Sequence, residues 1–572
     1  MVSRIVLVLA LSVAGACAGD GRHEQVRATL KKTVSSESRP PYLRADKEGT
    51  RIWKLTRQFY ERRDFTPAWI DGTRPLPHID KLIVALRAAT AEGLDRQLYN
   101  VDLLAARRHE AGKGFLTKKG FDVAEAGTLD VWLTSLYMKY ASDLADGLSD
   151  LAHADPRWHI APEKFDPATH LEAALESGSV DRSLLQLTPD DSEYRELRDA
   201  LDHYRRLAAR DGWPALPARL TLKPGRQSPH VATLAARLSA TGDYAAGVAS
   251  SSSTARVYSS DLQDAVKRFQ RRHGLADDGV VGRNVVAEMN VPIERRIRQI
   301  ELNLERWRWL PRRLGERHIL VNIPEYQLEV RDGGRVPLRM RVVVGKRETP
   351  TPIFDDEMSY VVFSPYWNVP PTIAEGETLP EVLRDPAFLE RMNMEVLDEA
   401  GRTIEPLAIA LTDPTKYRFR QRPGAQNSLG LVKFMFPNQH NIYLHDTPAD
   451  SLFARTSRSF SHGCIRLERP LALAEYLLRD QPEWTRAAIE QAMHSGQERT
   501  VKLTAPIPVY LVYWTARAAD GAIHFRKDVY GIDAEQTVRL AKRLGRLRRD
   551  AAKPPRLPTP AAVTTSRPAA SN

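Results

Sequence analysis

The spacing of apolar residues predicts helices in the first part of the chain. Between residues 49 and 210 apolar positions recur at steps of three and four, the period of a helix that buries one face. The clearest series is Leu129, Trp132, Leu133, Leu136, Tyr137, Tyr140 and Leu144. The run Thr188-Pro189-Asp190-Asp191 is typical of a helix start, with a cap, a proline and then acids. We therefore expect a helical scaffold domain over residues 49–218.

Three further short helices are predicted over residues 219–292. The segments VATLAARL and DLQDAVKRFQRRHGL each carry one apolar face, and the turn DGVVG leads into a third helix. The stretch AAGVASSSSTA between the first two is low in complexity and predicts a mobile loop. Apolar residues at steps of four and three then predict a connecting helix over residues 293–316.

After Glu316 the apolar period falls to two, which indicates β-strands. The strand-like segments are HILVNI, YQLEV, VPLRMRVVVG, SYVVFSPYWNV, LVKFMF, IYLH, TVKLT, VYLVYW and AIHFR. A stretch rich in proline and acids interrupts them near residues 368–428, and so long an insert is often a lid or binding loop. The pattern predicts a mainly β domain over residues 317–532 and an α+β multidomain fold.

The two ends of the chain carry signals of another kind. Residues 1–18 have a basic start, a short apolar core and small residues, as in a signal peptide, which predicts export to a periplasm or cell envelope. The apolar core is shorter than the ~20 residues of a membrane span, no later segment supplies one, and Cys17 leaves a lipid anchor open. Residues 20–48 are polar and expected to be poorly ordered. Asp533 is expected to cap a basic helix over residues 533–549, before a disordered tail over 550–572.

Charge and cysteine content narrow the function. The chain has 83 basic and 72 acidic residues, a formal charge of +11 that suits an acidic partner such as nucleic acid, a membrane surface or an anionic polymer. It shows no recognisable nucleic-acid module, so we expect no nucleic-acid partner. The two cysteines are Cys17 and Cys464. If Cys17 is removed with the signal peptide, Cys464 has no disulfide partner in an oxidising compartment. An unpaired thiol there is expected either to be buried or to have a chemical function.

The residues around Cys464 favour a role as a nucleophile. His445 lies in NIYLHDTP, and SHGCIRLE follows after fifteen further residues. Only about 3% of an unperturbed thiol is ionised at pH 7, so a nucleophilic cysteine needs an imidazole to take its proton. His445 is expected to end a strand and Cys464 to precede a helix, so that a loop brings them together. Gly463 would admit a substrate, while nearby amides and the Tyr443 hydroxyl could hold an oxyanion, at ~3 kcal/mol per donor.

Two other interpretations of Cys464 stay open at this point. Unpaired cysteines are among the most buried residues in proteins, so a core position is one. Zinc is the other, with His440, His445, His462 and Cys464 as ligands, although their spacing matches no standard zinc motif.

Several motifs resemble known families. LKPG, AVKRFQRRHGL and DGVVG resemble the peptidoglycan-binding type 1 domain. Tyr-Leu-His followed by SHGCIR resembles the signature of L,D-transpeptidases with the YkuD catalytic domain. ERWRWLP, VVVGK, PYWNVP, NSLGLVKFMFPN and HDTP extend that resemblance to the large periplasmic members of the family, over residues 50 to 530.

The resemblance implies a mechanism. Cys464 would attack the carbonyl at the L-centre of meso-diaminopimelate in a donor tetrapeptide, with His445 as base and then as acid for the departing D-alanine. The amides of Gly463 and Cys464, with Tyr443, would hold the oxyanion. The side-chain amine of a second stem would then attack the thioester and form a 3→3 cross-link.

The resemblance also implies supporting roles. Ser461 and His462 belong to the motif, and Arg466 would meet a stem carboxylate or make a structural pairing. Trp367 would line the groove or join the core, and the insert near 368–428 would cap the substrate. Peptidoglycan stem peptides and glycan are the implied partners, and no metal or organic cofactor is needed.

Three alternatives remain. An L,D-carboxypeptidase would form the same thioester and pass it to water. A wall-binding scaffold would have lost the activity. A zinc hydrolase would depend on His440 and be sensitive to a chelator.

Overall fold

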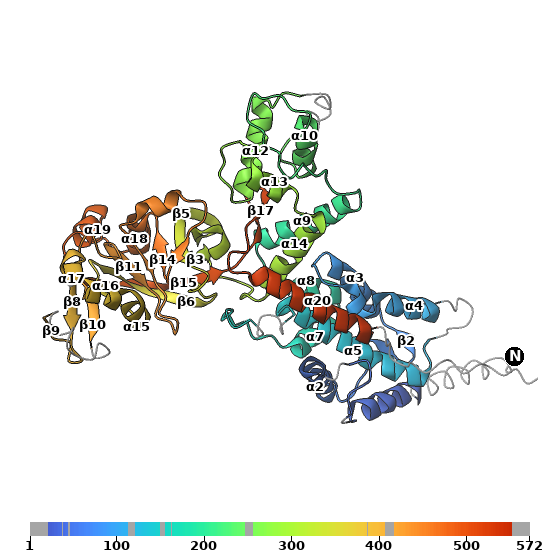
Figure 1. The fold of residues 1–572 in the computed structure, drawn as a ribbon. Helices are drawn as coiled ribbons and strands as arrows, with labels where there is room; N and C mark the ends of the chain where they lie inside the picture. Colours follow the sequence, from blue (N-terminus) through green and yellow to red (C-terminus); the bar gives the residue numbers. More distant parts are fainter. Residues whose placement is uncertain are drawn as a thin grey trace, which may run out of the picture.

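The computed structural model has three lobes (Figure 1). It describes residues 21–36, 38–43, 46–112, 120–148, 155–161, 163–245, 256–385, 387–405 and 417–551. The predicted signal peptide with Cys17, nearly all of AAGVASSSSTA and the tail from 552 lie outside these residues. No helix within the described ranges is long and apolar enough to cross a membrane.

The helical lobe is built around one buried helix. Its helices are α2 (Lys47–Arg62), α3 (His78–Arg87), α4 (Val101–Gly112), α5 (Val123–Ala145), α7 (Pro167–Glu176), α8 (Val180–Leu185) and α9 (Ser192–Ala208). Helix α5 buries most of its residues, including the predicted apolar series.

The predicted cap of α9 was wrong by one turn. The helix is capped by Asp191, whose side chain accepts a hydrogen bond from the Glu193 amide at 2.8 Å, whereas the Thr188 hydroxyl donates to the Leu185 carbonyl.

The expectation of poor order before residue 48 was wrong for residues 21–34, which are helical. Val26, Leu30 and Val34 recur at steps of four and are fully buried. Most of the surrounding residues are charged or polar, so the composition of this segment gave no sign of the narrow apolar stripe. The stripe stabilises the helix because it packs against the rest of the helical lobe.

The second lobe has a hydrophobic core of its own. Helices α10 (Val231–Ala240), α12 (Ser260–Arg272) and α13 (Arg283–Met289) enclose a cluster that includes Leu234, Leu238, Leu262 and Phe269. Apolar spacing predicted the next helix, α14 (Ile293–Arg308), although it ends at Arg308 rather than at residue 316. It packs against α9 of the helical lobe before the chain enters the third lobe.

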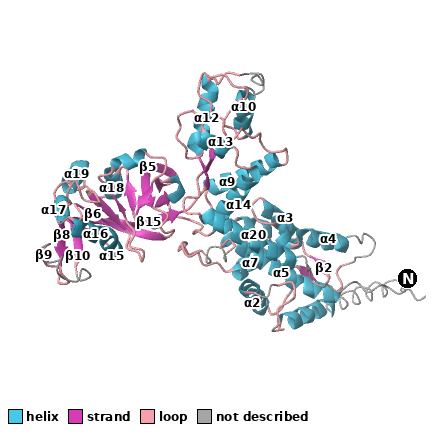
Figure 2. Ribbon diagram, viewed as in Figure 1, coloured by secondary structure: helices cyan, strands magenta, loops and turns pink. Residues whose placement is uncertain are grey.

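The third lobe is a nine-stranded sheet (Figure 2). Its strands are β3 (Arg317–Asn322), β4 (Gln327–Asp332), β5 (Arg335–Gly345), β6 (Asp355–Phe363), β11 (Val432–Met435), β12 (Leu444–His445), β13 (Ser459–Ser461), β14 (Ile465–Leu467) and β15 (Arg499–Val512). They are ordered β13-β5-β14-β12-β11-β6-β15-β3-β4, and β4 also pairs with β5, so the sheet closes on itself. Helices α18 (Pro470–Leu478) and α19 (Arg486–Met493) follow. Two predictions were wrong in detail. Cys464 is followed by β14 rather than directly by a helix, and TVKLT lies in the same strand, β15, as the first four residues of VYLVYW.

The insert near residues 368–428 is a small folded unit. Strands β7 (Trp367–Asn368), β8 (Met394–Leu397), β9 (Thr403–Ile404) and β10 (Arg418–Gln421) form a four-stranded sheet. Short helical turns α15 (Pro371–Ile373), η4 (Ala374–Thr378), α16 (Leu379–Arg384) and α17 (Ala387–Arg391) accompany it. Val382, Leu389, Val396 and Phe419 belong to its separate core. Residues 406–416 lie outside the described residues.

The last helix returns to the first lobe. After the hairpin β16 (Ala516–Ala519) and β17 (Ala522–Phe525), α20 (Ile532–Ala551) begins beside the end of α14 and runs over the helical lobe (Figure 1). Arg543 pairs with Glu48 at 3.0 Å and Arg548 with Asp95 at 2.6 Å. Asp533 is not its cap. It lies in the first turn, where it accepts a hydrogen bond from Thr515 and pairs with Arg306 at 2.7 Å.

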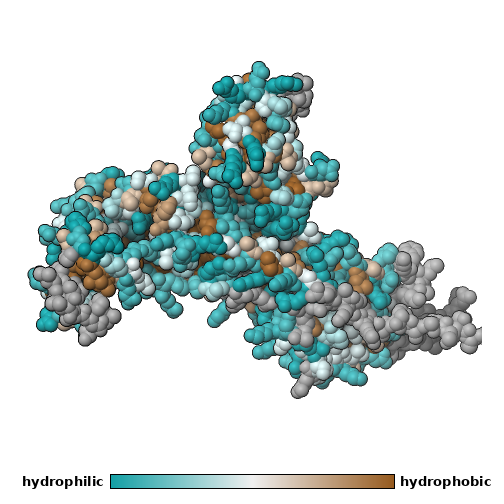
Figure 3. Space-filling view, viewed as in Figure 1, coloured by the Kyte–Doolittle hydropathy of each residue, from teal (hydrophilic) through white to brown (hydrophobic). Residues whose placement is uncertain are grey.

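The face of the molecule drawn in Figure 3 is mostly hydrophilic, with apolar side chains in scattered patches. This agrees with a charged fraction of 27%.

Candidate active site

Cys464 lies in the turn between β13 and β14, beside β12. Strands β12 and β14 are parallel, with Leu444 opposite Ile465 and His445 opposite Arg466. The Ile465 amide donates to the Tyr443 carbonyl at 3.1 Å. This register brings Tyr443 beside Cys464 and Arg466 beside His445, so segments nineteen residues apart in the sequence meet at one point.

The Cys464 thiol is half-buried. Its Sγ donates a weak hydrogen bond to the Asn441 carbonyl at 3.7 Å. Burial raises the pKa of the thiol above its ordinary value of 9.0, although hydrogen bonds from the backbone and side chain of Tyr443 and the charge of Arg466 oppose that rise. In this state the sulfur is protonated at neutral pH. Among the described residues, no hydrogen bond joins Sγ to His445.

His445 is a neutral base with a fixed tautomer. Its ring is 4% exposed, and Nδ1 lies 2.5 Å from the Asp446 carbonyl oxygen. A carbonyl only accepts, so Nδ1 carries the proton and Nε2 keeps its lone pair. Burial, and then the charge of Arg466, lowers the pKa of His445 to about 3. The pair at rest is therefore a neutral thiol and a neutral imidazole. This arrangement suits proton transfer during attack rather than a standing ion pair.

The turn that carries Cys464 is braced by hydroxyl groups. The Ser461 hydroxyl accepts from the Gly463 amide at 3.1 Å and donates to the Cys464 carbonyl at 2.5 Å. The Thr351 hydroxyl donates to the Gly463 carbonyl at 2.7 Å. Gly463 has φ +123°, and a Cβ there would lie 3.2 Å from Ile442 Cδ1. Only glycine takes this backbone conformation readily.

These hydrogen bonds determine which of the expected oxyanion donors are free to bind a ligand. The Gly463 amide is already used by Ser461, whereas no described residue accepts from the Cys464 amide. The Tyr443 ring lies 5.7 Å from that of His445, and burial raises the pKa of its hydroxyl, which stays a donor.

Arg466 is a cation without a counterion. Its side chain makes no ion pair within the described part of the chain, and its Nε is buried with no hydrogen-bond partner. Burial lowers the pKa of the guanidinium, while the nearby Cys464 opposes that shift. An unpaired buried donor of this kind is costly unless a ligand supplies the acceptor.

His462 and Trp367 are engaged with the insert. His462 Nε2 lies 2.7 Å from Glu377 Oε1, and Lys346 Nζ lies 4.0 Å from the same oxygen. Because Glu377 belongs to η4, this contact joins the insert to the turn that carries Cys464. Trp367 packs against the separate core of the insert.

Sequence reasoning missed the residues that shape the approach to Cys464. The Asn438 side chain accepts from the His440 amide at 3.0 Å and donates to the Ile442 carbonyl at 2.8 Å. It fixes the loop in which Asn441, at φ +55°, presents its carbonyl to the sulfur. Asparagines in a turn between strands were the available signal. Thr351 gave no such signal.

The zinc interpretation finds no geometric support. The ring of His440 lies 4.3 Å from that of His159 and 4.9 Å from that of Phe354. Within the described ranges, no three residues of the histidine, cysteine or carboxylate type form a group that could hold a metal ion.

Three parts of the chain match family models. Residues 54–201 match "Scaffold domain", residues 227–289 "Putative peptidoglycan binding domain", and residues 316–495 "L,D-transpeptidase catalytic domain". A "Putative L,D-transpeptidase" of Haemophilus influenzae is 34% identical over 240 residues, which cover 41% of this chain and 48% of that protein. The chain thus spans about half the length of this relative.

Two solved structures were also compared with this chain. The L,D-transpeptidase from Mycobacterium smegmatis is 17% identical with a TM-score of 0.17, over 34% of this chain and 58% of that one. The L,D-transpeptidase from Xylanimonas cellulosilytica is 16% identical with a TM-score of 0.18, over 52% of this chain and all of that one. At these scores the structures add no argument. The family models and the Haemophilus relative show that this α+β multidomain chain carries a YkuD-type L,D-transpeptidase catalytic domain and a peptidoglycan-binding type 1 domain.

Proposed function

We propose that the chain is a peptidoglycan L,D-transpeptidase that forms 3→3 cross-links through a thioester at Cys464. The observation that supports this most is the pairing of β12, which ends at His445, with β14, which begins directly after Cys464, together with the free Nε2 of His445. Acyl transfer through a cysteine needs a nucleophile and a base on neighbouring segments.

In the first half-reaction Cys464 Sγ attacks the carbonyl at the L-centre of diaminopimelate, and His445 Nε2 takes the thiol proton. The Cys464 amide and the Tyr443 hydroxyl hold the oxyanion. The C–N bond to D-alanine then breaks, and His445 gives its proton to the departing amine. A base positioned in this way typically contributes ~10²–10⁴ in rate.

In the second half-reaction the side-chain amine of another stem attacks the thioester. His445 takes a proton from that amine as the new amide bond forms. The C–S bond breaks and the thiolate regains the proton. If water replaces the amine, the product is a tripeptide, and the enzyme acts as an L,D-carboxypeptidase.

The surrounding residues fit a peptide with carboxylates. Arg466, which lacks a counterion, would bind a carboxylate of the donor stem in a charge-assisted hydrogen bond, typically worth ~1.5–3 kcal/mol. The insert, joined to the active-site turn through Glu377 and His462, would cap the bound stem. Peptidoglycan glycan and stems are the proposed partners, in the cell envelope. Export through residues 1–18 and a lipid anchor at Cys17 stay predictions.

The test is incubation of the protein with disaccharide tetrapeptides, followed by mass analysis. A cross-linked dimer that has lost D-alanine is expected. Tripeptide alone would identify a carboxypeptidase, and no new product would refute both activities and leave the wall-binding scaffold. Cys464→Ala should abolish all product, while a chelator should change nothing. Loss of activity with chelator and in His440→Ala would point to the zinc hydrolase.

A further inference from the structure

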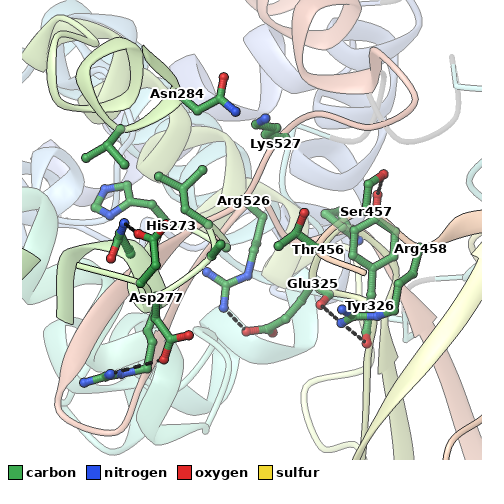
Figure 4. Close-up of a pocket in the computed structure, with 18 of the residues that line it drawn as sticks. His273, Asp277, Asn284, Glu325, Tyr326, Thr456, Ser457, Arg458, Arg526 and Lys527 are labelled. Carbon is green, nitrogen blue, oxygen red and sulfur yellow. Dashed lines mark hydrogen bonds and ion pairs between the residues drawn. The ribbon is translucent and has the colours of Figure 1, made fainter. Parts of the chain in front are cut away.

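A cavity of about 990 Å³ lies between the peptidoglycan-binding lobe and the catalytic sheet (Figure 4). One wall is formed by residues 270–285, and the other by residues 324–327 and 456–458. Arg526 and Lys527, which follow β17, lie between the walls. None of the residues of the Cys464 turn lines it, so it is separate from the active site described above.

One guanidinium fixes the distance between the two walls. Arg526 pairs with Glu325 of the catalytic wall at 2.6 Å and donates to the Arg272 carbonyl of the opposite wall at 2.6 Å. Arg272 is in turn held by Asp243 in an almost buried ion pair. Hydrogen bonds and ion pairs therefore hold the two walls of the cavity together.

The lining carries an excess of positive charge. Six cationic side chains face three carboxylates, and the cations are Arg271, Arg283, Arg341, Arg458, Arg526 and Lys527. The carboxylates are engaged: Glu325 pairs with Arg526, Asp277 with Arg271 at 3.4 Å, and Asp278 accepts from Gln270 at 2.7 Å. Cations therefore neutralise Glu325 and Asp277 but not Asp278, and the cavity lining keeps a net positive charge.

Three of the cations have no carboxylate partner among the described residues. Arg283 and Lys527 are exposed and make no ion pair. Arg458 donates only to carbonyls, those of Val342 at 3.2 Å, Arg455 at 2.7 Å, Tyr326 at 3.1 Å and Glu325 at 3.5 Å. Carbonyls position a guanidinium but do not neutralise it, so the cavity has an unbalanced positive field.

We propose that this cavity binds a carboxylate-bearing stem peptide of peptidoglycan as a second stem site, an inference that rests on the proposed function. The site is separate from the active-site turn but close to it along the chain, because Arg458 directly precedes β13 and lies six residues before Cys464. Six extended residues reach at most ~20 Å. A stem held here keeps neighbouring stems of the same strand within reach of the thiol.

The lining favours a peptide over a bare glycan. Sugars bind proteins largely through aromatic faces, but the guanidinium of Arg458 already covers the Tyr326 ring, 5.2 Å from its centroid. The remaining apolar surface, from Leu275 and Val529, suits alanine methyl groups. The unpaired cations supply the partners for carboxylates.

The test compares two double variants in a Cys464→Ala background, which prevents turnover. Arg283→Gln/Lys527→Gln removes two exposed cations that line the cavity. Lys223→Gln/Arg335→Gln is the matched control, since it removes two exposed cations that do not line the cavity, one from each lobe. Calorimetric titration uses a reduced disaccharide tetrapeptide, the same probe with amidated carboxylates, and the peptide-free disaccharide.

In the control we expect two binding events for the tetrapeptide, one of which is weakened about threefold to tenfold in the Arg283→Gln/Lys527→Gln variant. Amidation should weaken both events, because Arg466 also binds a stem carboxylate. The proposal would be overturned if the two double variants bound the tetrapeptide equally well. It would also be overturned if the peptide-free disaccharide bound as tightly as the tetrapeptide. Product formation by the wild type is measured separately. If no product forms but the second event is lost in the cavity variant, the cavity stands and the proposed function fails.

Discussion

The ionisation state of Cys464 can be tested by alkylation. In the structure the thiol has a raised pKa and His445 has a pKa of about 3, so the resting pair is neutral. We therefore predict that iodoacetamide reacts with Cys464 slowly at neutral pH and faster as the pH rises. The reaction follows the thiolate, because the thiol itself is a poor nucleophile.

The expected pH dependence of the alkylation rate follows from the thiol's pKa, which burial raises above the ordinary value of 9.0. At pH 7 less than about 1% is thiolate, and each pH unit below the pKa lowers that fraction tenfold. Between pH 6 and 9 the alkylation rate should thus rise about 1,000-fold. A standing thiolate–imidazolium pair would instead be almost fully ionised at pH 7 and react about 100-fold faster there.

The assay measures alkylation from pH 5.5 to 10.5 by mass spectrometry, with the adduct located on the Cys464 peptide. His445→Gln should leave this profile within about twofold while it lowers acyl transfer by ~10²–10⁴. His462→Gln is the matched control, since that ring faces Glu377. A rate that is flat between pH 5.5 and 8, and that falls sharply in His445→Gln, would refute a neutral pair.

Four further changes test other parts of the structure. Gly463→Ala forces a side chain into φ +123° and should slow acylation at least tenfold through ~1–3 kcal/mol of strain, measured by stopped flow. Arg517→Met removes the cation shared by half-buried Glu193 and buried Glu325 and Glu329, which keep Arg331 and Arg526, and should cost ~1.5–3 kcal/mol in urea unfolding. His524 has its pKa lowered by burial to about 4, below an unfolded value of 6.5, so stability is full above pH 6.5 and about 3 kcal/mol is lost by pH 4. His524→Gln should flatten that part of the pH profile. Glu377→Gln removes an exposed contact of at most ~1 kcal/mol and should speed proteolysis of the insert up to about fivefold.

Each of these has an outcome that contradicts it. Normal acylation by Gly463→Ala would mean that the turn relaxes without cost. An unchanged urea midpoint for Arg517→Met would mean that water reaches the carboxylates. An equal acid loss in His524→Gln would assign that loss to other groups, such as His445 and His273. Unchanged proteolysis of Glu377→Gln would show that the insert is held by its other contacts.

The sequence predicted those features that local periodicity and short motifs determine. The helices α5, α12 and α14 and the strands β3 to β6 follow apolar spacing, and the Cys464 and His445 motifs lie close enough in sequence to be recognised together. These patterns survive folding because each element buries one face.

What the sequence could not predict depends on contacts between distant segments. The brace from Thr351 to Gly463 joins residues 112 positions apart, and nothing local marks that threonine. The use of the Gly463 amide by Ser461 appears only once the turn is folded. The fold of the insert was missed because its strands are only two to four residues long and its core is small.

The return of α20 to the first lobe has a consequence for biogenesis. Its Arg543 meets Glu48 across 495 positions, so the helical lobe is completed by residues made long after its first helices. Contacts of such long sequence separation form late and slowly. We expect the helical lobe to remain incomplete until α20 has been synthesised, and a premature stop before Ile532 to leave a product that quality-control proteases degrade.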